Sequence, residues 1–493
     1  MDELIPLRLG TLAQMPAQIA RPRYARAALS PGIVHIGLGN FHRAHMAWYT
    51  HRLMQQGQAL DWAIIGAGVR PGDGAMRDRL LAQDCLTTLI ELAPTGTSAE
   101  ITGAMLDFAP VEAGNAALIA RMADPQTRIV SLTVTEGGYF TDPATGGLQL
   151  DHPDLIHDAT RPDSPRTAFG AIVAALRLRR AQGLGPVTLL SCDNLQGNGA
   201  ILRQAVLGLA QASDPDLAAW IGGECSFPGA MVDCIVPATG AGEIALARRF
   251  GIDDASPVTH EPFRQWVLED DFCAGRPAWE DVGVQFSDDL HGYEAQKLRI
   301  LNAGHQIIGN VAELQGIATV AEAMATPQIR AFFEKVQTRE IVPHVRPVPG
   351  MTPVEYVTLI AGRFSNPAIR DTVRRVAFDG SSRHPGFVLP SLRDALAHGA
   401  AYDGLALVEA LWARMCAGTR EDGSVIAPND PHWPQLVAQA QAARDDPAAW
   451  LRQSGCYGDL ADHPGFAQSF GTWLTLLWSQ GSDAALRAYL DAP

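Results

Sequence analysis

The sequence has no closely spaced pair of cysteines. Its seven cysteines are scattered over 493 residues, and no two of them form a CxxC pair. This odd number and wide spacing are typical of free thiols in a reducing compartment, and they argue against a disulfide framework or structural zinc. We therefore expect a cytoplasmic protein whose cysteines are reduced.

Long apolar runs are also absent. No uninterrupted apolar stretch in the sequence approaches the length of about 18 residues that a membrane-spanning helix needs. Residues 1–6 contain neither a basic segment nor an apolar core, so we expect no signal peptide. The sequence therefore predicts no membrane partner.

Positive charge is scarce. The 38 lysines and arginines are outnumbered by 53 aspartates and glutamates, which gives a net charge of −15. This balance disfavours binding to nucleic acid or to anionic membranes. With 47% apolar and 18% charged residues, the composition is typical of a globular protein with a core. No clear apolar stripe for self-association is evident, so the oligomeric state stays open and a monomer is compatible with the sequence.

Short apolar runs alternate with helical patterns in the first half of the chain. The runs predicted to be buried strands are residues 32–37, 62–68, 128–135 and 186–191, and helical patterns between them include 43–56 and 166–182. Strands that alternate with helices favour a doubly wound parallel sheet, which is an α/β fold of the Rossmann type. We expect this domain to span residues 1–290.

Helical patterns dominate the second half. They cover residues 293–315, 318–336, 353–378, 390–417, 431–443 and 462–490. The change in pattern falls near residues 282–291, so we expect a mostly α-helical second domain over residues 291–493.

A glycine turn follows the first predicted strand. Gly37 permits a tight turn, and Gly39 lets the backbone approach a pyrophosphate, with Asn40 and Phe41 opening the helix that follows. Position 42, where the usual fingerprint has a third glycine, is His42. The motif therefore predicts a dinucleotide site, although a structural strand–helix turn remains the alternative.

Asp73 lies just beyond the second predicted strand. A carboxylate there accepts hydrogen bonds from ribose hydroxyls and repels a 2′-phosphate, which favours NAD over NADP. Arg70 nearby weakens this exclusion, and an ordinary turn aspartate is the alternative. A second pair, Gly66 and Gly68, is interpreted as close backbone packing because Pro71 takes the place of a third glycine.

Three polar residues share one side of the helix predicted over 293–315. At ~100° per residue, Lys297 lies at 0°, His305 at ~80° and Asn302 at ~140°. An amine, an amide and an imidazole together suit a site that removes a proton from a hydroxyl and polarises the resulting carbonyl. An exposed lysine, a helix-end asparagine and a core histidine are the structural alternative.

The sequence offers little for a metal. Although it has 14 histidines, it contains no HExxH motif and no Cys/His cluster beside His42 and His45. Without a metal, the base must be an amine or an imidazole. A lysine desolvated beside a cofactor has a depressed pKa, so Lys297 is the candidate base.

Other polar residues follow predicted strands or lie in the helical half. Asn194 and Glu136 follow strands, where an amide suits a developing alkoxide and a carboxylate suits a proton relay. Asp233 suits a polyol hydroxyl, and Arg375 and Arg383 can bind substrate oxygens. Turn formation, helix capping and solvated charge are the respective alternatives.

Several motifs together resemble one known family, the polyol-specific long-chain dehydrogenases/reductases. The motifs are GIVHIGLGNFHRAH (32–45), SLTVTEGGY (131–139), SCDNLQGNG (191–199), SFPGAMVD (226–233), EPFRQWVLED (261–270), GRPAWEDVGVQF (275–286), KLRILNAGH (297–305), RFSNPAI (363–369) and DGSSR (379–383). The resemblance covers nearly the whole chain. It implies metal-free hydride transfer with NAD in a cleft between a Rossmann-type and a helical domain.

The resemblance also implies roles for the candidate residues. Lys297 resembles the general base, and Asn194 and Asn302 resemble the pair that holds the oxyanion. His305 resembles the residue that orients substrate and lysine, and Glu136 a residue of the proton channel. The remaining correspondences are Asp73 with the coenzyme-selecting acid, and Asp233, Arg375 and Arg383 with contacts to substrate hydroxyls.

We expect a reversible oxidation of a polyol secondary alcohol, with D-mannitol and D-fructose as the favoured pair and D-arabinitol or D-sorbitol as further substrates. Three departures from the family are Arg383, where lysine is also found, Cys234 for arginine and Gly72 for an acid. They leave the preferred polyol and the strictness for NAD open. The rival functions are a fructuronate or tagaturonate reductase, whose carboxylate Asp233 would repel, and a non-catalytic NAD-binding sensor.

Overall fold

The computed structural model describes residues 4–142, 146–453 and 455–492. The chain divides into two compact units, Met1–His291 and Gly292–Pro493. The first unit is built around a parallel sheet and the second is helical, so the expected α/β class and the helical C-terminal half are confirmed. In the described residues, no helix is long and apolar enough to cross a membrane.

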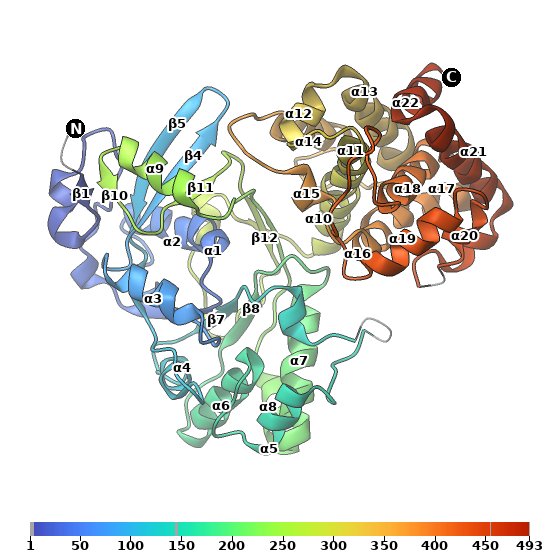
Figure 1. Cartoon of the computed structure of the whole chain (residues 1–493). Helices are drawn as coiled ribbons and strands as arrows, with labels where there is room; N and C mark the ends of the chain where they lie inside the picture. The colour runs from blue at the N-terminus through green and yellow to red at the C-terminus, as the bar shows by residue number, and fades with distance from the viewer. Residues whose placement is uncertain (1–3, 143–145, 454, 493) are drawn as a thin grey trace. The chain divides into compact units, whose positions relative to one another are not determined.

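A five-stranded parallel sheet forms the centre of the first unit (Figure 1). Its strands are β2 (Pro31–Ile36), β3 (Ala63–Ala67), β6 (Met105–Phe108), β7 (Ile129–Leu132) and β8 (Thr188–Ser191). The four predicted strands are confirmed, and β6 is an addition. The spatial order β6-β3-β2-β7-β8 reverses direction at β2, so the switch point lies between β2 and β7. Ligands of doubly wound sheets bind at such a point.

Helices connect these strands. They are α1 (Asn40–Ala44), α2 (Met46–Gln55), α3 (Asp73–Leu81), α4 (Ala116–Met122), α5 (Pro153–Thr160), α6 (Ala168–Ala181), α7 (Asn198–Ser213), α8 (Pro215–Glu224) and α9 (Ala241–Arg249). The helix predicted over 166–182 corresponds to α6, which Thr167 caps by accepting from the Gly170 amide. The helix predicted over 43–56 is broken at His45, whose ψ of −96° is not helical.

Three smaller sheets, which were not predicted, complete the first unit. They consist of β4 (Thr87–Ala93), β5 (Gly96–Thr102) and β11 (Val258–His260); of β9 (Ala230–Asp233), β12 (Gln265–Leu268) and β13 (Gln285–Phe286); and of β1 (Ile5–Pro6) with β10 (Ile252–Asp253). In Figure 1 the β4–β5 hairpin and β11 lie near α9, at the opposite end of this unit from α5–α8.

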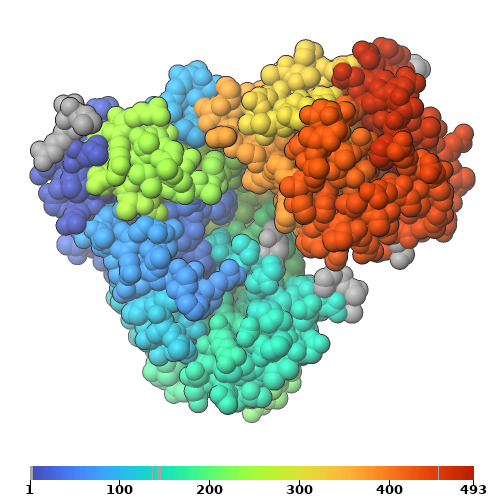
Figure 2. Space-filling model, in the orientation of Figure 1, coloured from blue at the N-terminus to red at the C-terminus, as the bar shows by residue number. Residues whose placement is uncertain are grey.

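Helices packed around α18 form the second unit. They are α10 (Leu290–Gln296), α11 (Ala303–Leu314), α12 (Val320–Ala325), α13 (Pro327–Val336), α14 (Pro353–Phe364), α15 (Val373–Val376), α16 (Gly380–Arg383), α17 (Leu389–His398), α18 (Asp403–Cys416), α19 (Trp433–Ala442), α20 (Ala448–Leu451), α21 (Pro464–Gln480) and α22 (Ser482–Asp491). Every residue of α18 after the first is buried, including Glu409 and Arg414, as expected for a helix at the centre of a unit. The last helices, orange to red, cover much of the visible face of this unit in Figure 2.

Four of the long helices predicted in this half are each divided in two. The run over 318–336 ends before Pro327, and the run over 390–417 is interrupted at Gly399, whose φ is +63°. The run over 462–490 is interrupted at Gly481, and the run over 353–378 contains a non-helical segment after Phe364. Proline and left-handed glycine end helices here, which apolar periodicity alone does not reveal.

Candidate active site

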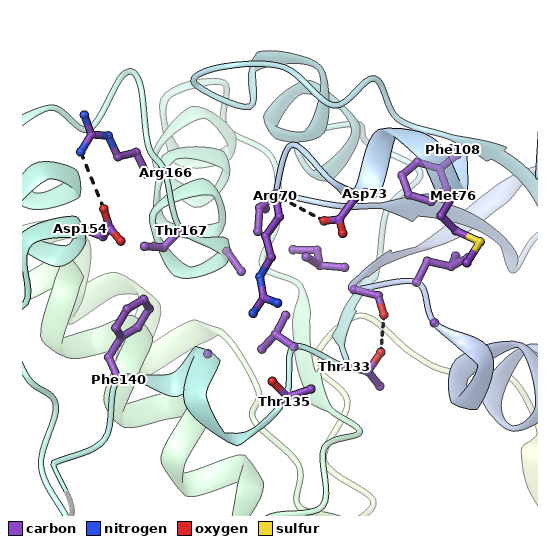
Figure 3. Close-up of a pocket in the computed structure, with 18 residues that line it drawn as sticks. Arg70, Asp73, Met76, Phe108, Thr133, Thr135, Phe140, Asp154, Arg166 and Thr167 are labelled. Carbon is purple, nitrogen blue, oxygen red and sulfur yellow. Dashed lines mark hydrogen bonds and ion pairs between the residues drawn. The ribbon is translucent and has the colours of Figure 1, made fainter. Parts of the chain in front are cut away.

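A cavity of about 340 Å³ opens at the carboxyl ends of β2, β3 and β7 (Figure 3). It lies at the switch point of the sheet, where a dinucleotide is expected. Three of the residues predicted to bind the cofactor line it, namely Gly37, Gly39 and Asp73. The other lining residues are Ile36, Leu38, Val69, Arg70, Met76, Phe108, Thr133, Val134, Thr135, Gly138, Phe140, Asp154, Arg166, Thr167 and Ala168.

The two motif glycines are required for different reasons. Gly37 has a φ of +87°, and a Cβ atom there would lie 2.1 Å from the Thr133 carbonyl oxygen. Thr133 also donates its hydroxyl to the Gly37 carbonyl at 2.6 Å, which fixes the turn. A Cβ on Gly39 would meet no atom nearer than the Gly37 oxygen at 4.0 Å. The space beside Gly39 therefore leaves its backbone open to a ligand, and this fits a pyrophosphate.

Asp73 begins α3 and closes the turn after β3. Its carboxylate accepts a hydrogen bond from the Arg70 amide at 3.0 Å. A Cβ on Gly68 would lie 2.3 Å from the Asp73 Cβ, and one on Gly66 would lie 2.6 Å from Leu38, so close packing explains this second glycine pair as predicted. Figure 3 shows the Arg70 side chain extending into the cavity toward Thr135. The cavity therefore contains the Asp73 carboxylate and the Arg70 guanidinium, and either group could contact the hydroxyls or the 2′-phosphate of a bound ribose.

The side chains of Asn40 and Phe41 do not line this cavity. Asn40 donates its amide to the Pro237 carbonyl and to the Thr239 hydroxyl, both at 2.9 Å. Phe41 stacks on the His45 ring at a centroid distance of 4.7 Å. Any contact of these two residues with a cofactor would therefore use their backbone amides.

Glu136 opens the short 3-10 helix Glu136–Tyr139 that follows β7. Its side chain lies outside the part of the chain that the structure describes. Its predicted role in proton relay stays a prediction.

Asp193 is a site residue that sequence reasoning missed. Its buried carboxylate accepts hydrogen bonds from the amides of Val134 at 3.0 Å and Thr135 at 2.9 Å. Thr135 lines the cavity and has a φ of +67°, which is unfavourable for a β-branched residue. The signal in the sequence was the position of Asp193 beside Asn194, shortly after a buried strand. Asp193 therefore holds one wall of the cavity in a strained conformation.

Tyr139 completes the support of this wall. Its hydroxyl donates to Asp193 at 2.8 Å and lies 2.6 Å from the Ser191 hydroxyl. Burial raises the pKa of Tyr139 well above its ordinary value, and the nearby Asp193 charge raises it further. The phenol therefore stays neutral and acts as a donor to the carboxylate.

Two predicted substrate-site residues belong to the first unit. Asn194 follows β8, at the carboxyl edge of the parallel sheet. Asp233 ends β9, is 6% exposed and pairs in register with Gln265 of β12. Strand ends therefore position both residues.

The predicted helix around Lys297 is continuous, but its middle is a π-helix. Between α10 and α11, residues Lys297–Asn302 form the wider turn, and the Ala303 amide reaches back to the Leu298 carbonyl. The predicted angles, which assumed α-helical geometry, are therefore wrong for this segment. A π-helix pairs residues i and i+5, so Lys297 and Asn302 lie one turn apart. Each is 8% exposed, so both side chains are buried.

His305 lies in the first turns of α11. Its ring stacks on Phe364 at a centroid distance of 4.4 Å, and its Nε2 lies 3.9 Å from Asp371. Burial lowers the pKa of His305 to about 3, against an opposing effect from Asp371. The imidazole is therefore neutral near neutral pH. Among the described residues its buried Nε2 has no hydrogen-bond partner, so its capacity for a hydrogen bond is unused.

The predicted substrate arginines lie close together. Arg375, which is exposed, donates two hydrogen bonds to the buried Asp371, at 2.6 and 2.5 Å. Arg383 donates to the backbone carbonyls of Arg375 at 3.1 Å and Val376 at 2.8 Å. Both guanidinium groups influence His305, so the structure brings them to the same region of the second unit.

No group of three His, Cys, Asp or Glu side chains in the described residues is arranged to hold a metal ion. Metal independence itself stays a prediction. On the helix of the second unit, the amine and the imidazole suit proton transfer from a hydroxyl, and the amide can donate a hydrogen bond to the resulting oxygen.

Comparison with protein families matches both units. Residues 31–281 match the mannitol dehydrogenase Rossmann domain, and residues 289–478 match the mannitol dehydrogenase C-terminal domain. The chain belongs to the mannitol dehydrogenase family. This confirms the resemblance to polyol-specific long-chain dehydrogenases.

Individual members of the mannitol dehydrogenase family align over almost the whole chain. Mannitol 2-dehydrogenase of Cereibacter sphaeroides is 54% identical over 97% of this chain and 100% of its own length. The Pseudomonas fluorescens mannitol 2-dehydrogenase, solved in a ternary complex with NAD and D-mannitol, is 39% identical, with a TM-score of 0.89 over 99% of this chain and 100% of that one. A D-sorbitol dehydrogenase in substrate-free form is 34% identical, with a TM-score of 0.89 over 97% of this chain and 100% of that one.

Proposed function

We propose that the protein is an NAD-dependent polyol dehydrogenase that interconverts D-mannitol and D-fructose, and that it acts without a metal. The observation that carries this proposal is the buried pair of Lys297 and Asn302, one π-turn apart, with the neutral His305 beyond it. The 54% identity to a mannitol 2-dehydrogenase supports the choice of substrate.

The cofactor would be held by the first unit. When bound, NAD supplies the acceptor for the hydride. Gly37 and Gly39 provide backbone that a pyrophosphate can approach, and Asp73 accepts hydrogen bonds from ribose hydroxyls. Asn40 and Phe41 act through their backbone amides.

The chemical step is assigned to the residues whose roles the family resemblance implies. Neutral Lys297 accepts the proton of the substrate hydroxyl, a function commonly worth about 10²–10⁴-fold in rate. Asn194 and Asn302 donate to the oxygen on which charge develops, at about 3 kcal/mol for each donor. His305 orients that oxygen through its Nε2, and Glu136 passes the proton toward solvent.

Substrate selection is assigned to Asp233, Arg375 and Arg383, which would bind the remaining hydroxyls. The charge of Arg375 is compensated by Asp371, and the Arg383 guanidinium donates to two backbone carbonyls. This arrangement favours neutral polyols over the acidic sugars of a uronate reductase. A non-catalytic NAD-binding sensor would not require the buried Lys297 and Asn302.

A panel of substrates and coenzymes tests the proposal. We expect the purified protein to form NADH from D-mannitol, with slower or no reaction on D-arabinitol and D-sorbitol and none on D-fructuronate in reverse. Turnover should survive EDTA and should be higher with NAD than with NADP. Turnover of fructuronate in preference to fructose would support the uronate reductase, and binding of NADH without any turnover would support the sensor.

A further inference from the structure

Asp371 lies between two residues assigned to the substrate. Its carboxylate is 5% exposed and accepts both hydrogen bonds from Arg375, while one of its oxygens lies 3.9 Å from His305 Nε2. The Arg375 side chain is 58% exposed, so the pair joins a buried carboxylate to an accessible guanidinium cation. A carboxylate and a guanidinium joined by two parallel bonds form the geometry by which arginine also binds acidic ligands.

Three arginines and one acid act on the protonation of His305. Arg375, Arg383 and Arg363 all disfavour protonation of His305, and Asp371 is the acid that favours it. A neutral polyol gains only hydrogen bonds from a guanidinium such as that of Arg375. A sugar acid would gain strongly, because a guanidinium that lacks a partner binds a carboxylate in two-point geometry.

We propose that Asp371 is a specificity-determining residue that occupies Arg375 internally and so keeps the site selective for neutral polyols over sugar acids. The inference rests on the proposed function, because it assumes that Arg375 faces the substrate. Asp371 acts on the substrate through Arg375 and His305, so it is a positioning residue. Neither the sequence motifs nor the assigned site residues include it.

Replacement by asparagine removes the charge and little else. The new amide side chain in Asp371→Asn would keep one carbonyl oxygen that can accept from Arg375. The bond from the Val320 amide to the backbone carbonyl at this position, 2.9 Å long, does not involve the side chain. Since the Arg375 side chain is largely exposed, leaving it without a full ion pair costs little folding stability. Asp371→Asn should therefore fold.

The experiment compares a neutral and an acidic ligand in the wild type and in Asp371→Asn. The probes are D-mannitol as substrate and D-mannonate, which carries a carboxylate in place of one terminal alcohol, as inhibitor. We expect the inhibition constant for mannonate to fall about tenfold and the KM for mannitol to rise. The gain in mannonate affinity should shrink as salt is added, because it is electrostatic.

Two further variants make the result specific. Asp446→Asn removes an exposed acid that pairs with Arg452 in the same unit, and it should leave both constants unchanged. Asp371→Asn combined with Arg375→Gln should lose the gain in mannonate affinity, because the released guanidinium is gone. An unchanged inhibition constant for mannonate in Asp371→Asn, or a gain that persists in the double variant, would overturn the proposal.

The failure of this inference can be separated from the failure of the proposed function. Mannonate binding to the protein with NADH can be measured by calorimetry, without turnover. If the wild type fails to oxidise mannitol, the proposed function fails. If the wild type oxidises mannitol but the variant binds mannonate no better, only the role of Asp371 fails.

Discussion

The two units hold their polar groups in different ways. In the first unit the cavity wall is largely backbone, fixed by Thr133 and Asp193 at the ends of parallel strands. In the second unit the candidate groups are side chains on a π-helix and beside it, and their properties depend on burial and on neighbouring charges. Backbone suits a cofactor whose phosphates need amides, whereas proton transfer needs an amine or an imidazole. Changes at the cavity wall of the first unit should therefore alter coenzyme affinity, and changes on the π-helix of the second unit should alter turnover.

The largest effect is expected for Lys297→Ala. This change removes the proposed base, so we expect kcat for mannitol oxidation to fall by about 10³-fold while the dissociation constant for NADH stays within about twofold. Steady-state kinetics and fluorescence titration with NADH measure the two quantities.

The sequence offers a matched control, because Lys297 and Lys335 are its only lysines. Lys335 donates to the Tyr489, Leu490 and Ala492 carbonyls at the end of α22, so Lys335→Ala should lower stability and leave kcat unchanged. Near-normal turnover of Lys297→Ala would contradict the assignment of the base.

Gly37→Ala should have a smaller effect than Lys297→Ala, and it should change the dissociation constant for NADH and not kcat. The new Cβ would lie 2.1 Å from the Thr133 carbonyl oxygen, so the turn must move and the dissociation constant for NADH should rise about tenfold or more. Isothermal calorimetry with NADH measures this change.

Gly57→Ala is the control for backbone strain. Gly57 has a φ of +79°, close to that of Gly37, but a Cβ there meets no atom within 4 Å. Both variants carry the cost of a left-handed alanine, of about 1 kcal/mol in stability. If Gly57→Ala weakened NADH binding as much as Gly37→Ala, the clash at the cofactor turn would not be the cause.

Asp193→Asn should weaken NADH binding by a few-fold. Its side chain holds the amides of Val134 and Thr135, and asparagine can accept from only one of them without turning a donor toward the other. The dissociation constant for NADH should rise while kcat at saturating NAD stays nearly constant. Asp61→Asn, an exposed acid paired with Arg128, serves as the control. A fall in kcat at saturating NAD without a change in NADH affinity would show that Asp193 acts on the chemistry instead.

Lowering the pH should destabilise the first unit more than the second. Of the changes considered, this one should alter turnover least. Burial lowers the pKa of His35, His51 and His260 to about 3 from 6.5, and all three belong to the first unit. A lowered folded-state pKa means that the unfolded chain binds protons first, so stability is constant above pH 6.5 and falls as the pH decreases from 6.5 toward 3. The first unit should therefore lose more protection from hydrogen exchange at pH 5 than the second, which has His305 with a shift of this size.

His260→Gln tests the origin of this difference. It should reduce the loss of stability between pH 7 and pH 5 by about 1–2 kcal/mol, since one buried group no longer takes up a proton on unfolding. The exposed His432 gives the control variant His432→Gln. Equal acid sensitivity of the two units would contradict the prediction.

Much of the cofactor site could be predicted because it depends on local sequence. The apolar runs that became β2, β3, β7 and β8 and the turn at Gly37 were evident from the order of residue types. Asp193 was missed, because its role depends on two amides almost 60 positions earlier in the chain. Asn40 and Phe41 were expected to bind the cofactor, and only the structure showed that their side chains contact other parts of the first unit.

The sequence by itself determined the class of fold and the family, and it supplied the candidate residues for the chemistry, because each depends on residue types at fixed spacings. Only the tertiary structure decided that Lys297 and Asn302 lie one π-turn apart, since a single changed backbone hydrogen-bond pattern has no signature in apolar periodicity. Only the tertiary structure placed Asp371 between His305 and Arg375. That placement depends on how separate helices pack. The sequence alone does not show which of its many acidic residues lies beside His305.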